Sequence, residues 1–401
     1  MQLVYLSPEK ITPNRAPSYQ ILHTVQALAA AGVPGLFVTP WPATRLQRTC
    51  RELIGIGFPD AWRIVSVGPG PDLPILSRRW PNQVWTGLSA RIQRFLLDFA
   101  SHNADAVVYT RSRRMAAAVP EEVHLPVIFE YHEPESIVKK EEGHDQRTVQ
   151  RIRDEELCGA RRADALVTVT ECHARQAKQL YGIEAKPYVI RNGVDTSVFQ
   201  LPSRQCVPGR LLYIGSLQAW KGLDLLARAV ARVPQATLHV CGGVRQSQAW
   251  RVFAGRCQAL GIQERVEMLG TLPQTELHRV AATAVAGVLP IDGRYRIARE
   301  YTSPLKLFEY LALGLPVIAT DLPSVREIVA HDREAILFQD GSEAALAHSI
   351  NELIADPRRI ADMSQRALDA SGRYTWNHRA RQIIEVARQV SLTRGSRAEA
   401  A

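Results

Sequence analysis

SPLKLFEYLALGLPVIAT, which occupies residues 303–320, predicts a short helix followed by a buried strand. Ser303 is a favoured N-cap residue, and Pro304 suits the first helical position, where a missing amide costs nothing. At the other end, Gly314 suits the left-handed residue that follows the last turn, and Pro316 prevents the helix from continuing. The segment therefore contains a complete helix, with both of its ends marked, and the strand that comes after it.

The start of this helix is suited to binding an anion. The amides of Leu305 and Lys306 have no partner within the helix, and the positive end of the helix dipole favours a phosphate placed there. One turn further along, Glu309 interrupts an otherwise apolar row. Two interpretations of Glu309 stay open at this point: a contact with a ligand, or an ion pair with Lys306 on the surface of an amphipathic helix.

Strands and helices alternate twice along the chain, on either side of a linker near residue 200. In the first alternation, strands are expected at residues 3–6, 36–39, 106–110, 127–130, 165–169 and 188–190, with helices that include residues 19–31 and 91–103. In the second, strands are expected at residues 210–214, 237–241, 266–269, 286–290 and 317–320. Residues 40–90 are rich in proline and glycine and receive no assignment.

This order predicts an α/β fold of two Rossmann-like, doubly wound domains that face one cleft, with ligands beyond the carboxyl ends of the strands. The first domain is expected at residues 1–200 and the second at residues 201–372. A helix is expected at residues 373–390, and the polar stretch at residues 391–401 is expected to be disordered.

Composition places the chain among ordinary globular proteins. Its 401 residues suffice for two domains, and 46% of them are hydrophobic and 22% charged. The first apolar run is too short for a signal peptide, and no stretch reaches the roughly 18–20 apolar residues that span a bilayer. The six cysteines are scattered without metal-ligand spacing, and there is no Asp-x-Asp pair. We therefore predict a cytoplasmic protein with reduced thiols that needs neither a metal nor another cofactor.

The net charge of +9 raises the question of an anionic partner. Arginines with interleaved aromatic residues gather in the first half of the chain, at Arg78, Arg79, Trp80, Trp85, Arg91, Arg94, Phe95, Phe99, Arg111, Arg113 and Arg114. No nucleic-acid recognition motif accompanies them, so nucleic acid is not expected as a partner. A solvated surface and contact with the anionic headgroups of a membrane both stay open, and the second would make the protein peripheral on the inner face of the cell membrane.

Glycine-containing turns follow two strands of the second domain. Tyr213-Ile-Gly215-Ser216 leads to Lys221-Gly222, where glycine lets the backbone approach a ligand and the lysine can place a charge on a diphosphate. Cys241-Gly242-Gly243 follows the next strand, and an ordinary tight turn explains it equally well. Both turns come earlier in the chain than the helix and strand predicted at residues 303–320.

Together these segments closely resemble the donor site of the GT4-type retaining glycosyltransferases, which have the GT-B fold. The resemblance implies that the helix amides hold the diphosphate of a nucleotide-sugar, that Glu309 holds the ribose hydroxyls, and that Lys221 contacts phosphate. It also implies main-chain contacts to the base near Leu269. His132, in Glu130-Tyr-His-Glu133, corresponds to a family histidine that reaches the transferred sugar from across the cleft, and the helix begun by Trp376 corresponds to one that crosses back to the first domain.

The sequence departs from the family pattern at three places. Ser216 stands where the family has an arginine, and Tyr301 stands where it has a glutamate, eight residues before Glu309; Glu300 lies one residue away. The loop after the first strand, which includes residues 14–18, has no glycine, although many relatives have a Gly-Gly pair there. Lys306, Arg294 and Arg296 are candidates for the charge that Ser216 lacks.

The resemblance implies a metal-independent, retaining transfer of a sugar from a nucleotide-diphosphate sugar to a glycan or lipid-linked acceptor. Catalytic roles are expected for His132, Lys221 and Glu309. Donor contacts are expected from Gly215, Ser216, Gly242, Gly243, Leu269, Ser303, Leu305, Lys306 and Glu309. A nucleotide-sugar 2-epimerase of the same architecture and a non-catalytic partner subunit stay open as alternatives.

Overall fold

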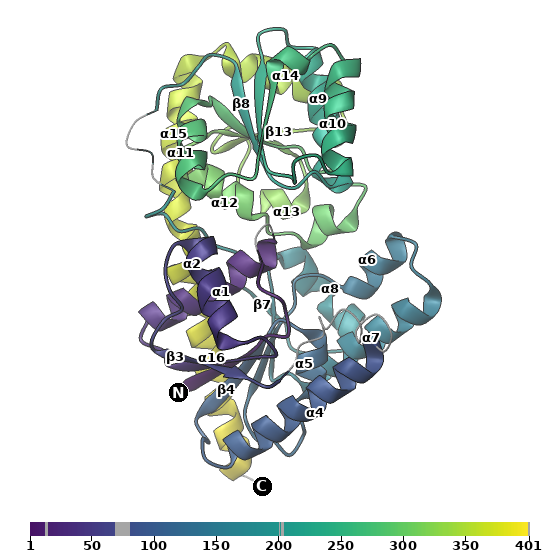
Figure 1. The fold of residues 1–401 in the computed structure, drawn as a ribbon, viewed down its shortest axis with the longest axis vertical. Helices are drawn as coiled ribbons and strands as arrows, with labels where there is room; N and C mark the ends of the chain where they lie inside the picture. Colours follow the sequence, from purple (N-terminus) through teal and green to yellow (C-terminus); the bar gives the residue numbers. More distant parts are fainter. Residues whose placement is uncertain (13–14, 69–80, 200, 202–203, 400–401) are drawn as a thin grey trace. The chain divides into compact units, whose positions relative to one another are not determined.

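The computed structural model describes the chain except for residues 13–14, 69–80, 200, 202–203 and 400–401 (Figure 1). The expected Arg78, Arg79 and Trp80 of the basic region, and Asn14 of the loop after the first strand, lie outside the described residues. The chain forms two compact units. The first contains residues 1–191 together with residues 376–401, and the second contains residues 192–375. The expected boundaries, after residues 200 and 372, lie close to these divisions.

The first unit is built on a seven-stranded parallel sheet with the order β3-β2-β1-β4-β5-β6-β7. Its strands are β1 (Gln2–Leu6), β2 (Gly35–Thr39), β3 (Trp62–Ser66), β4 (Ala106–Thr110), β5 (Val127–Glu130), β6 (Ala165–Thr168) and β7 (Tyr188–Val189). β1 pairs with β2 through Val4 and Leu36, and with β4 through Val4 and Val108. The strand order reverses direction between β1 and β4, so the chain leaves these two strands toward opposite sides.

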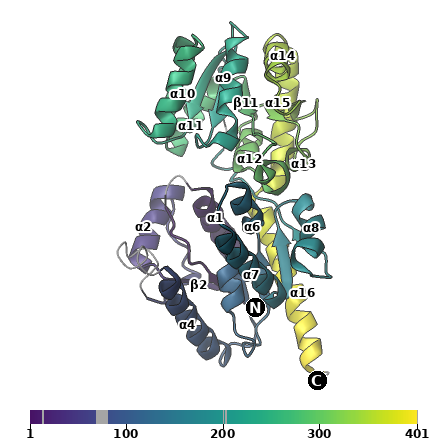
Figure 2. The ribbon, with the colours of Figure 1, turned by 90° about the vertical axis from the view of Figure 1, so that its right-hand side faces the viewer.

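Helices cover both faces of this sheet. They are α1 (Ala16–Ala30), α2 (Ala43–Ile54), α4 (Pro81–Ala100), α5 (Arg113–Ala118), α6 (Glu135–Glu141), α7 (Gln146–Arg162), α8 (Glu171–Tyr181) and α16 (Trp376–Glu399). Leu88 and Ile92 of α4 pack on Val4 and Val108 of one face. On the opposite face, α16 (yellow in Figure 2) lies beside α1. The rings of His23 and Trp376 stack there with centroids 5.2 Å apart.

The second unit repeats the plan with a six-stranded parallel sheet of order β10-β9-β8-β11-β12-β13. Its strands are β8 (Arg210–Ile214), β9 (Thr237–Cys241), β10 (Val266–Gly270), β11 (Ala286–Leu289), β12 (Val317–Thr320) and β13 (Ala335–Phe338). Its helices are α9 (Leu223–Ala231), α10 (Gln248–Ala259), α11 (Gln274–Thr283), α12 (Leu305–Ala312), α13 (Pro323–Arg326), α14 (Glu343–Ile354) and α15 (Pro357–Ser371). The reversal of strand order falls between β8 and β11.

Alternating side chains divide the core of the second unit into two layers. Leu211 and Tyr213 of β8 contribute to the layer formed with α9, α10 and α14. Leu212, between them, points to the layer that contains α11, α12 and α15. A strand buried on both faces must be apolar along its buried part, and the three buried central residues of β8, Leu211–Tyr213, meet this requirement. The two parallel, doubly wound sheets confirm the expected α/β fold.

Three parts of the chain differ from the sequence-based expectation. The stretch left unassigned at residues 40–90 contains α2 and β3, and α4 begins at Pro81, ten residues before the expected helix. The last helix also continues through most of the stretch expected to be disordered. Ser391 and Thr393 each donate a hydrogen bond to the carbonyl four residues earlier, and Arg394 forms an ion pair of 3.4 Å with Asp164. These contacts hold the final turns on the first unit, so the expectation of disorder was wrong for this part.

Candidate functional site

The expected donor residues of the second unit gather at the carboxyl edge of its sheet, beside the reversal between β8 and β11. Gly215 follows β8 directly, and α12 lies between β11 and β12 in the chain. In doubly wound sheets this reversal is where ligands bind, because the loops on its two sides leave in opposite directions. The strand ends are joined by backbone hydrogen bonds, from Gly215 to Cys241 at 2.8 Å and from Gly242 to Gly270 at 2.7 Å.

α12 begins one residue later than expected, which changes the role of Ser303. Pro304 is the N-cap and makes no side-chain cap, so the expected N-cap role of Ser303 was wrong. The hydroxyl of the buried Ser303 instead accepts a hydrogen bond of 3.2 Å from the Asn192 amide, and its carbonyl accepts one of 2.8 Å from the Asn192 side chain. Because α12 starts at Leu305, the amides of Leu305 and Lys306 are among those that have no partner within the helix.

Tyr310 fixes α12 against the end of β8. Its hydroxyl accepts a hydrogen bond of 2.8 Å from the amide of Ile214, the last residue of the strand. The same hydroxyl lies 3.3 Å from the carbonyl of Val288 in β11. The ring is fully buried, and a side chain at Gly287 would overlap it. The start of α12 is therefore held at the reversal of the strand order.

Lys306 and Glu309 lie half-buried on α12 without a partner. Neither side chain forms a hydrogen bond or ion pair with any other described residue, and Glu309 and Lys306 influence each other only through their charges. Burial raises the pKa of Glu309, and the positive charge of Lys306 opposes part of this rise. Burial likewise lowers the pKa of Lys306, against the effect of Glu309. An unpaired, partly desolvated cation and anion favour a ligand that carries both phosphate and hydroxyl groups.

The glycines after β8 and β9 leave space that Lys306 uses. A Cβ placed on Gly215 would overlap Lys306 Cε and lie 3.2 Å from Lys306 Nζ, so the ammonium group lies directly over this turn. A Cβ on Gly242 would overlap the carbonyl oxygen of Gly215. Only glycine permits this close approach of the two turns. Among the candidates for the charge that Ser216 lacks, Lys306 is thus the one over the glycine turn.

The other two candidates are engaged elsewhere. Arg294 is exposed and forms an ion pair of 2.7 Å with Asp292. Arg296 contacts Glu300 at 3.0 Å and donates a hydrogen bond of 2.7 Å to the hydroxyl of Tyr301. Tyr301 itself is buried in a π-helical turn, Ile297–Tyr301. At the position where the family has a glutamate, this chain therefore has the phenol of Tyr301, which accepts a hydrogen bond from Arg296.

The remaining donor candidates lie around the same turns. The Ser216 hydroxyl contacts the Gln218 side chain at 3.2 Å, and Gly243 packs against Leu217. The carbonyl of Leu269 accepts a hydrogen bond of 2.9 Å from Arg245, a residue that the sequence analysis did not identify. This hydrogen bond occupies one of the two lone pairs of the Leu269 carbonyl.

Lys221 ends a short 3-10 turn, Ala219–Lys221, just before α9. Its ammonium lies 3.3 Å from the centroid of the Trp220 ring, an arrangement in which the aromatic face stabilises the cation. The following residue, Gly222, passes so close to the carbonyl of Pro290 after β11 that a Cβ would overlap it. The turn that carries Lys221 is therefore held beside the end of β11, at the same reversal as Gly215.

In the first unit, His132 follows the carboxyl end of β5. Its Nε2 contacts Oε1 of Glu130, the last residue of the strand, and its side chain is 20% exposed. Arg111, after β4, lies 3.7 Å from the same carboxylate. Burial, and then the positive charge of Arg111, lower the pKa of His132 to about 4 despite the opposing effect of Glu130. The imidazole is therefore neutral near pH 7.

Glu130 and Arg379 form part of this arrangement, and no functional role for either is predicted from the sequence. Glu130 is fully buried, and the guanidinium of Arg379, which is also buried, binds it. A signal for Glu130 exists in the sequence, because it is a lone carboxylate at the end of the apolar strand 127–130. No comparable signal marks Arg379, since its partner lies 249 residues away in the chain.

Several arginines of the basic region are already paired. Arg113 forms an ion pair of 2.9 Å with Glu155, and Arg114 contacts the same carboxylate at 3.0 Å. The guanidinium of Arg114 also lies 4.4 Å from the centroid of the Trp85 ring. Paired arginines attract an anionic surface less than free ones, so fewer of these side chains are available for a membrane than the sequence indicates. Arg94, on α4, is exposed.

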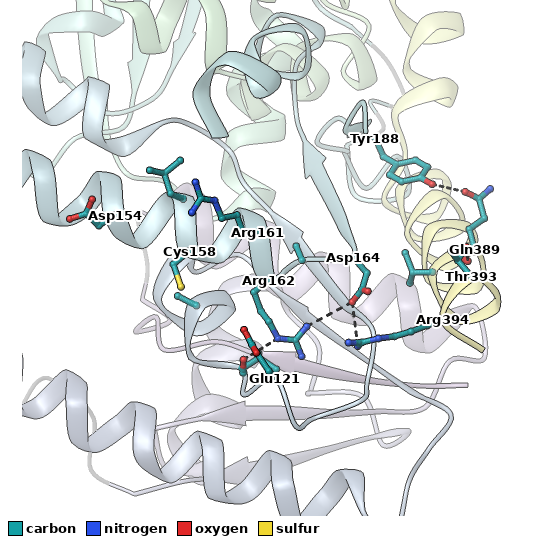
Figure 3. Close-up of a pocket in the computed structure, with 15 residues that line it drawn as sticks. Glu121, Asp154, Cys158, Arg161, Arg162, Asp164, Tyr188, Gln389, Thr393 and Arg394 are labelled. Carbon is teal, nitrogen blue, oxygen red and sulfur yellow. Dashed lines mark hydrogen bonds and ion pairs between the residues drawn. The ribbon is translucent and has the colours of Figure 1, made fainter. Parts of the chain in front are cut away.

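A groove of about 870 Å³ lies on the first unit, away from the expected site residues (Figure 3). It lies between the end of α7, the start of β6 and the last turns of α16. Arg162 donates hydrogen bonds to the carbonyls of Val119 and Val123 at 3.0 Å, and Arg394 forms an ion pair with Asp164. The groove opens near the start of a strand, whereas ligands of doubly wound sheets bind at the opposite ends. We assign it no part in the chemistry.

Two further observations concern the described part of the chain as a whole. No helix in it combines the length and the apolar character needed to cross a membrane. Within the same residues, no group of three or more histidine, cysteine, aspartate or glutamate side chains is arranged to hold a metal ion.

Comparison with known proteins agrees with this architecture. A family model described as glycosyltransferase family 4 matches residues 18–198, and one described as glycosyl transferases group 1 matches residues 208–356. Two curated relatives are a D-inositol 3-phosphate glycosyltransferase of Stackebrandtia nassauensis, 30% identical over 55% of this chain, and an alpha-maltose-1-phosphate synthase of Mycolicibacterium smegmatis, 25% identical over 57%. The matches span 53% and 64% of these relatives, so the chain covers little more than half of their length.

Solved structures share the fold over nearly the whole chain. A sucrose-phosphate synthase of Thermosynechococcus elongatus superposes with a TM-score of 0.74 at 18% identity, covering 98% of this chain and all of that one. The Anabaena protein HepE, solved in complex with UDP-glucose, superposes with a TM-score of 0.71 at 19% identity, covering 97% of this chain and all of that one. At such identities the likeness establishes the fold.

Proposed function

The chain belongs to glycosyltransferase family 4, and we propose that it transfers a sugar from a nucleotide-diphosphate sugar to a glycan or lipid-linked acceptor, with retention of anomeric configuration. The observation that carries the proposal is the half-buried, unpartnered pair of Lys306 and Glu309 at the start of α12. The cation lies over the Gly215 turn, and the anion lies one helical turn further along.

In this proposal the diphosphate is held at the start of α12. The helix amides of Leu305 and Lys306 donate to its oxygens, and the Lys306 ammonium supplies the charge that Ser216 does not. Glu309 accepts hydrogen bonds from the ribose hydroxyls. Lys221 stabilises the charge that develops on the leaving diphosphate. These cationic groups carry the role that a metal ion has in other transferases, so we propose a metal-independent reaction.

The acceptor side is assigned to the first unit. His132 is proposed to contact the transferred sugar. By their names, one of the proteins described above transfers sugar to an inositol phosphate, whereas the other two form a maltose phosphate and a sucrose phosphate. Because these names differ so widely, the acceptor of this chain is given only as a class. Because Arg94 on α4 of the first unit is exposed, we propose an anionic membrane surface as a further partner.

The test is release of nucleoside diphosphate from a panel of nucleotide-sugars, measured with and without glycan and lipid-linked acceptors and with and without a chelator. We expect acceptor-dependent release that the chelator does not abolish, and a product with the anomeric configuration of the donor. An epimerase would convert the nucleotide-sugar without acceptor, and a non-catalytic subunit would bind nucleotide without turnover. Lys221→Ala should lower turnover more than it weakens nucleoside binding.

A further inference from the structure

The carboxylate of Glu130 contacts more hydrogen-bond donors than a single buried ion pair would supply. It is fully buried at the end of β5. Gln20 donates to Oε1 at 2.7 Å, and Tyr109 donates to Oε2. His132 contacts Oε1 through Nε2, while Arg379 from α16 binds Oε2. These partners come from α1, β4, the loop after β5 and the last helix of the chain, so the carboxylate joins four segments that lie far apart in sequence.

Two arginines keep this carboxylate ionised. Arg379 is only 2% exposed, and its guanidinium also donates to the carbonyls of Ile190 and Arg191 at 2.8 and 2.9 Å. Arg111 lies 3.7 Å from the other oxygen. Burial raises the pKa of Glu130, but the charge of Arg379 and the contacts with His132 and Arg379 lower it below its usual value. An ionised carboxylate can only accept hydrogen bonds.

The tautomer of His132 follows from that condition. Since Glu130 cannot donate, the proton of the contact must belong to His132 Nε2. The imidazole interacts electrostatically with four ionisable groups, Glu130, Arg111, Arg379 and His173. Burial and the positive charge of Arg111 lower the pKa of His132, so the ring is neutral near pH 7. In a neutral imidazole with its proton on Nε2, Nδ1 carries a lone pair. No described residue forms a hydrogen bond with this Nδ1.

We propose that Glu130 is a positioning residue that fixes His132 in the Nε2–H tautomer, so that Nδ1 is presented as a hydrogen-bond acceptor to a hydroxyl of the bound sugar. The assignment of the ligand rests on the proposed function. A lone pair attracts a hydroxyl and repels the oxygens of a phosphate, so His132 recognises the sugar part of the donor and not its diphosphate. Arg379 supports this arrangement through Glu130, without contacting the substrate.

A purely structural role for Glu130, as the link between α16 and the sheet, makes a different prediction. In that case the imidazole tautomer would not depend on Glu130. Long-range ¹H–¹⁵N NMR of histidine-labelled protein reports the tautomer directly, and His132→Asn identifies the signal by its loss. For the wild type we expect a neutral ring with the proton on Nε2 throughout pH 5.5–8. A ring that is cationic at pH 7, or that carries its proton on Nδ1, overturns the proposal.

Glu130→Gln then tests the dependence on the carboxylate. An amide can donate as well as accept, so the Nδ1–H tautomer should become populated in this variant. Glu334→Gln, at another buried carboxylate in the second unit, is the matched control and should leave the His132 signal unchanged. If Glu130→Gln does not fold, Glu130→Asp keeps the charge while withdrawing the carboxylate by one methylene, and the same shift in tautomer is expected. An unchanged tautomer in the folded variant contradicts the proposal.

The kcat/KM values of two His132 variants show which imidazole nitrogen contacts the substrate. Asparagine at position 132 keeps an amide oxygen near the place of Nδ1, whereas glutamine keeps an N–H group near the place of Nε2. His132→Asn should therefore retain roughly ten-fold more kcat/KM than His132→Gln, the size expected for one hydrogen bond to the substrate. The reverse order refutes the acceptor role of Nδ1. If no nucleotide-sugar is turned over by the wild type, the proposed function fails, while the NMR result on the tautomer stands independently.

Discussion

Replacing Lys306 by methionine removes the positive charge while keeping an unbranched apolar stem of similar length. The lysine is half-buried, it lies over Gly215, and burial lowers its pKa. In the free protein its charge is partly desolvated without an ion-pair partner, which costs folding free energy. The thermal midpoint of the free variant should therefore equal or exceed that of the wild type.

The ligand reverses this balance. A charge-assisted hydrogen bond to a diphosphate contributes roughly 1.5–3 kcal/mol, so Lys306→Met should weaken binding of a nucleoside diphosphate by about 10- to 150-fold. Binding of the corresponding nucleoside, which lacks phosphate, should change little. Because the folded protein lowers the pKa of Lys306, the wild type should also lose diphosphate affinity as pH rises toward the ordinary lysine range, and the variant should not.

Isothermal titration calorimetry with UDP, ADP and GDP and with their nucleosides measures these differences. Arg232→Met is a suitable control, because Arg232 is an exposed cation of the same unit whose ion pair with Glu343 is 3.3 Å long. This control should bind every ligand as the wild type does. If Lys306→Met binds a nucleoside diphosphate as tightly as the wild type does, and the wild type binds that ligand well, then Lys306 does not contact the diphosphate over the Gly215 turn.

Three other outcomes are expected. Glu309→Gln should weaken the binding of nucleoside diphosphates by roughly 1.5–3 kcal/mol and should remove the preference for ribose over 2′-deoxyribose ligands. Calorimetry measures both effects, and a preserved preference contradicts the ribose contact. Gly242→Ala should lower the free energy of unfolding by roughly 1–3 kcal/mol in urea, because its Cβ overlaps the Gly215 carbonyl; unchanged stability would show that the two turns can move apart. The wild type should sediment with anionic vesicles at low salt and leave them near 1 M salt, and Arg91→Gln with Arg94→Gln should reduce sedimentation; equal sedimentation with uncharged vesicles argues against an electrostatic contact.

The fold was largely predictable because both sheets are parallel and buried. Strands such as 210–214 and 317–320 are short, mostly apolar segments that begin after a glycine or a proline, and they occur in the structure where the sequence predicts them. The stretch at 40–90 was harder, since α2 carries many polar residues and proline and glycine flank β3. α16 was predicted too short because polar composition hides the contacts that Arg394 makes with residues far away in the chain.

The candidate site was predictable to the extent that its residues are adjacent in sequence. Lys306 and Glu309 share one face of α12 through helical spacing, and Ser303 lies just before the helix in the sequence. The N-cap was misassigned because Asn192, which engages Ser303, is 111 residues distant. Arg245 and Arg379 were missed for the same reason: each contacts its partner through the tertiary fold, and a local pattern carries no information about such pairs.

The discontinuity of the first unit has a consequence for synthesis on the ribosome. Residues 192–375 form the second unit from one uninterrupted segment, so this unit can fold as soon as it has emerged. The first unit is synthesised earlier but receives α16 last. Until then the buried carboxylate of Glu130 lacks Arg379, and α1 lacks the helix beside it.

The order of synthesis and the order of completion are therefore opposite. A nascent chain that stalls after residue 375 carries a complete second unit and a first unit in which the buried Glu130 carboxylate has lost one of its two arginine partners. Without α16, the side of α1 that α16 covers is exposed, and we expect such a chain to be more sensitive to proteases than the full chain. Through Arg379, the stability of the first unit thus depends on a segment that is synthesised after the whole of the second unit.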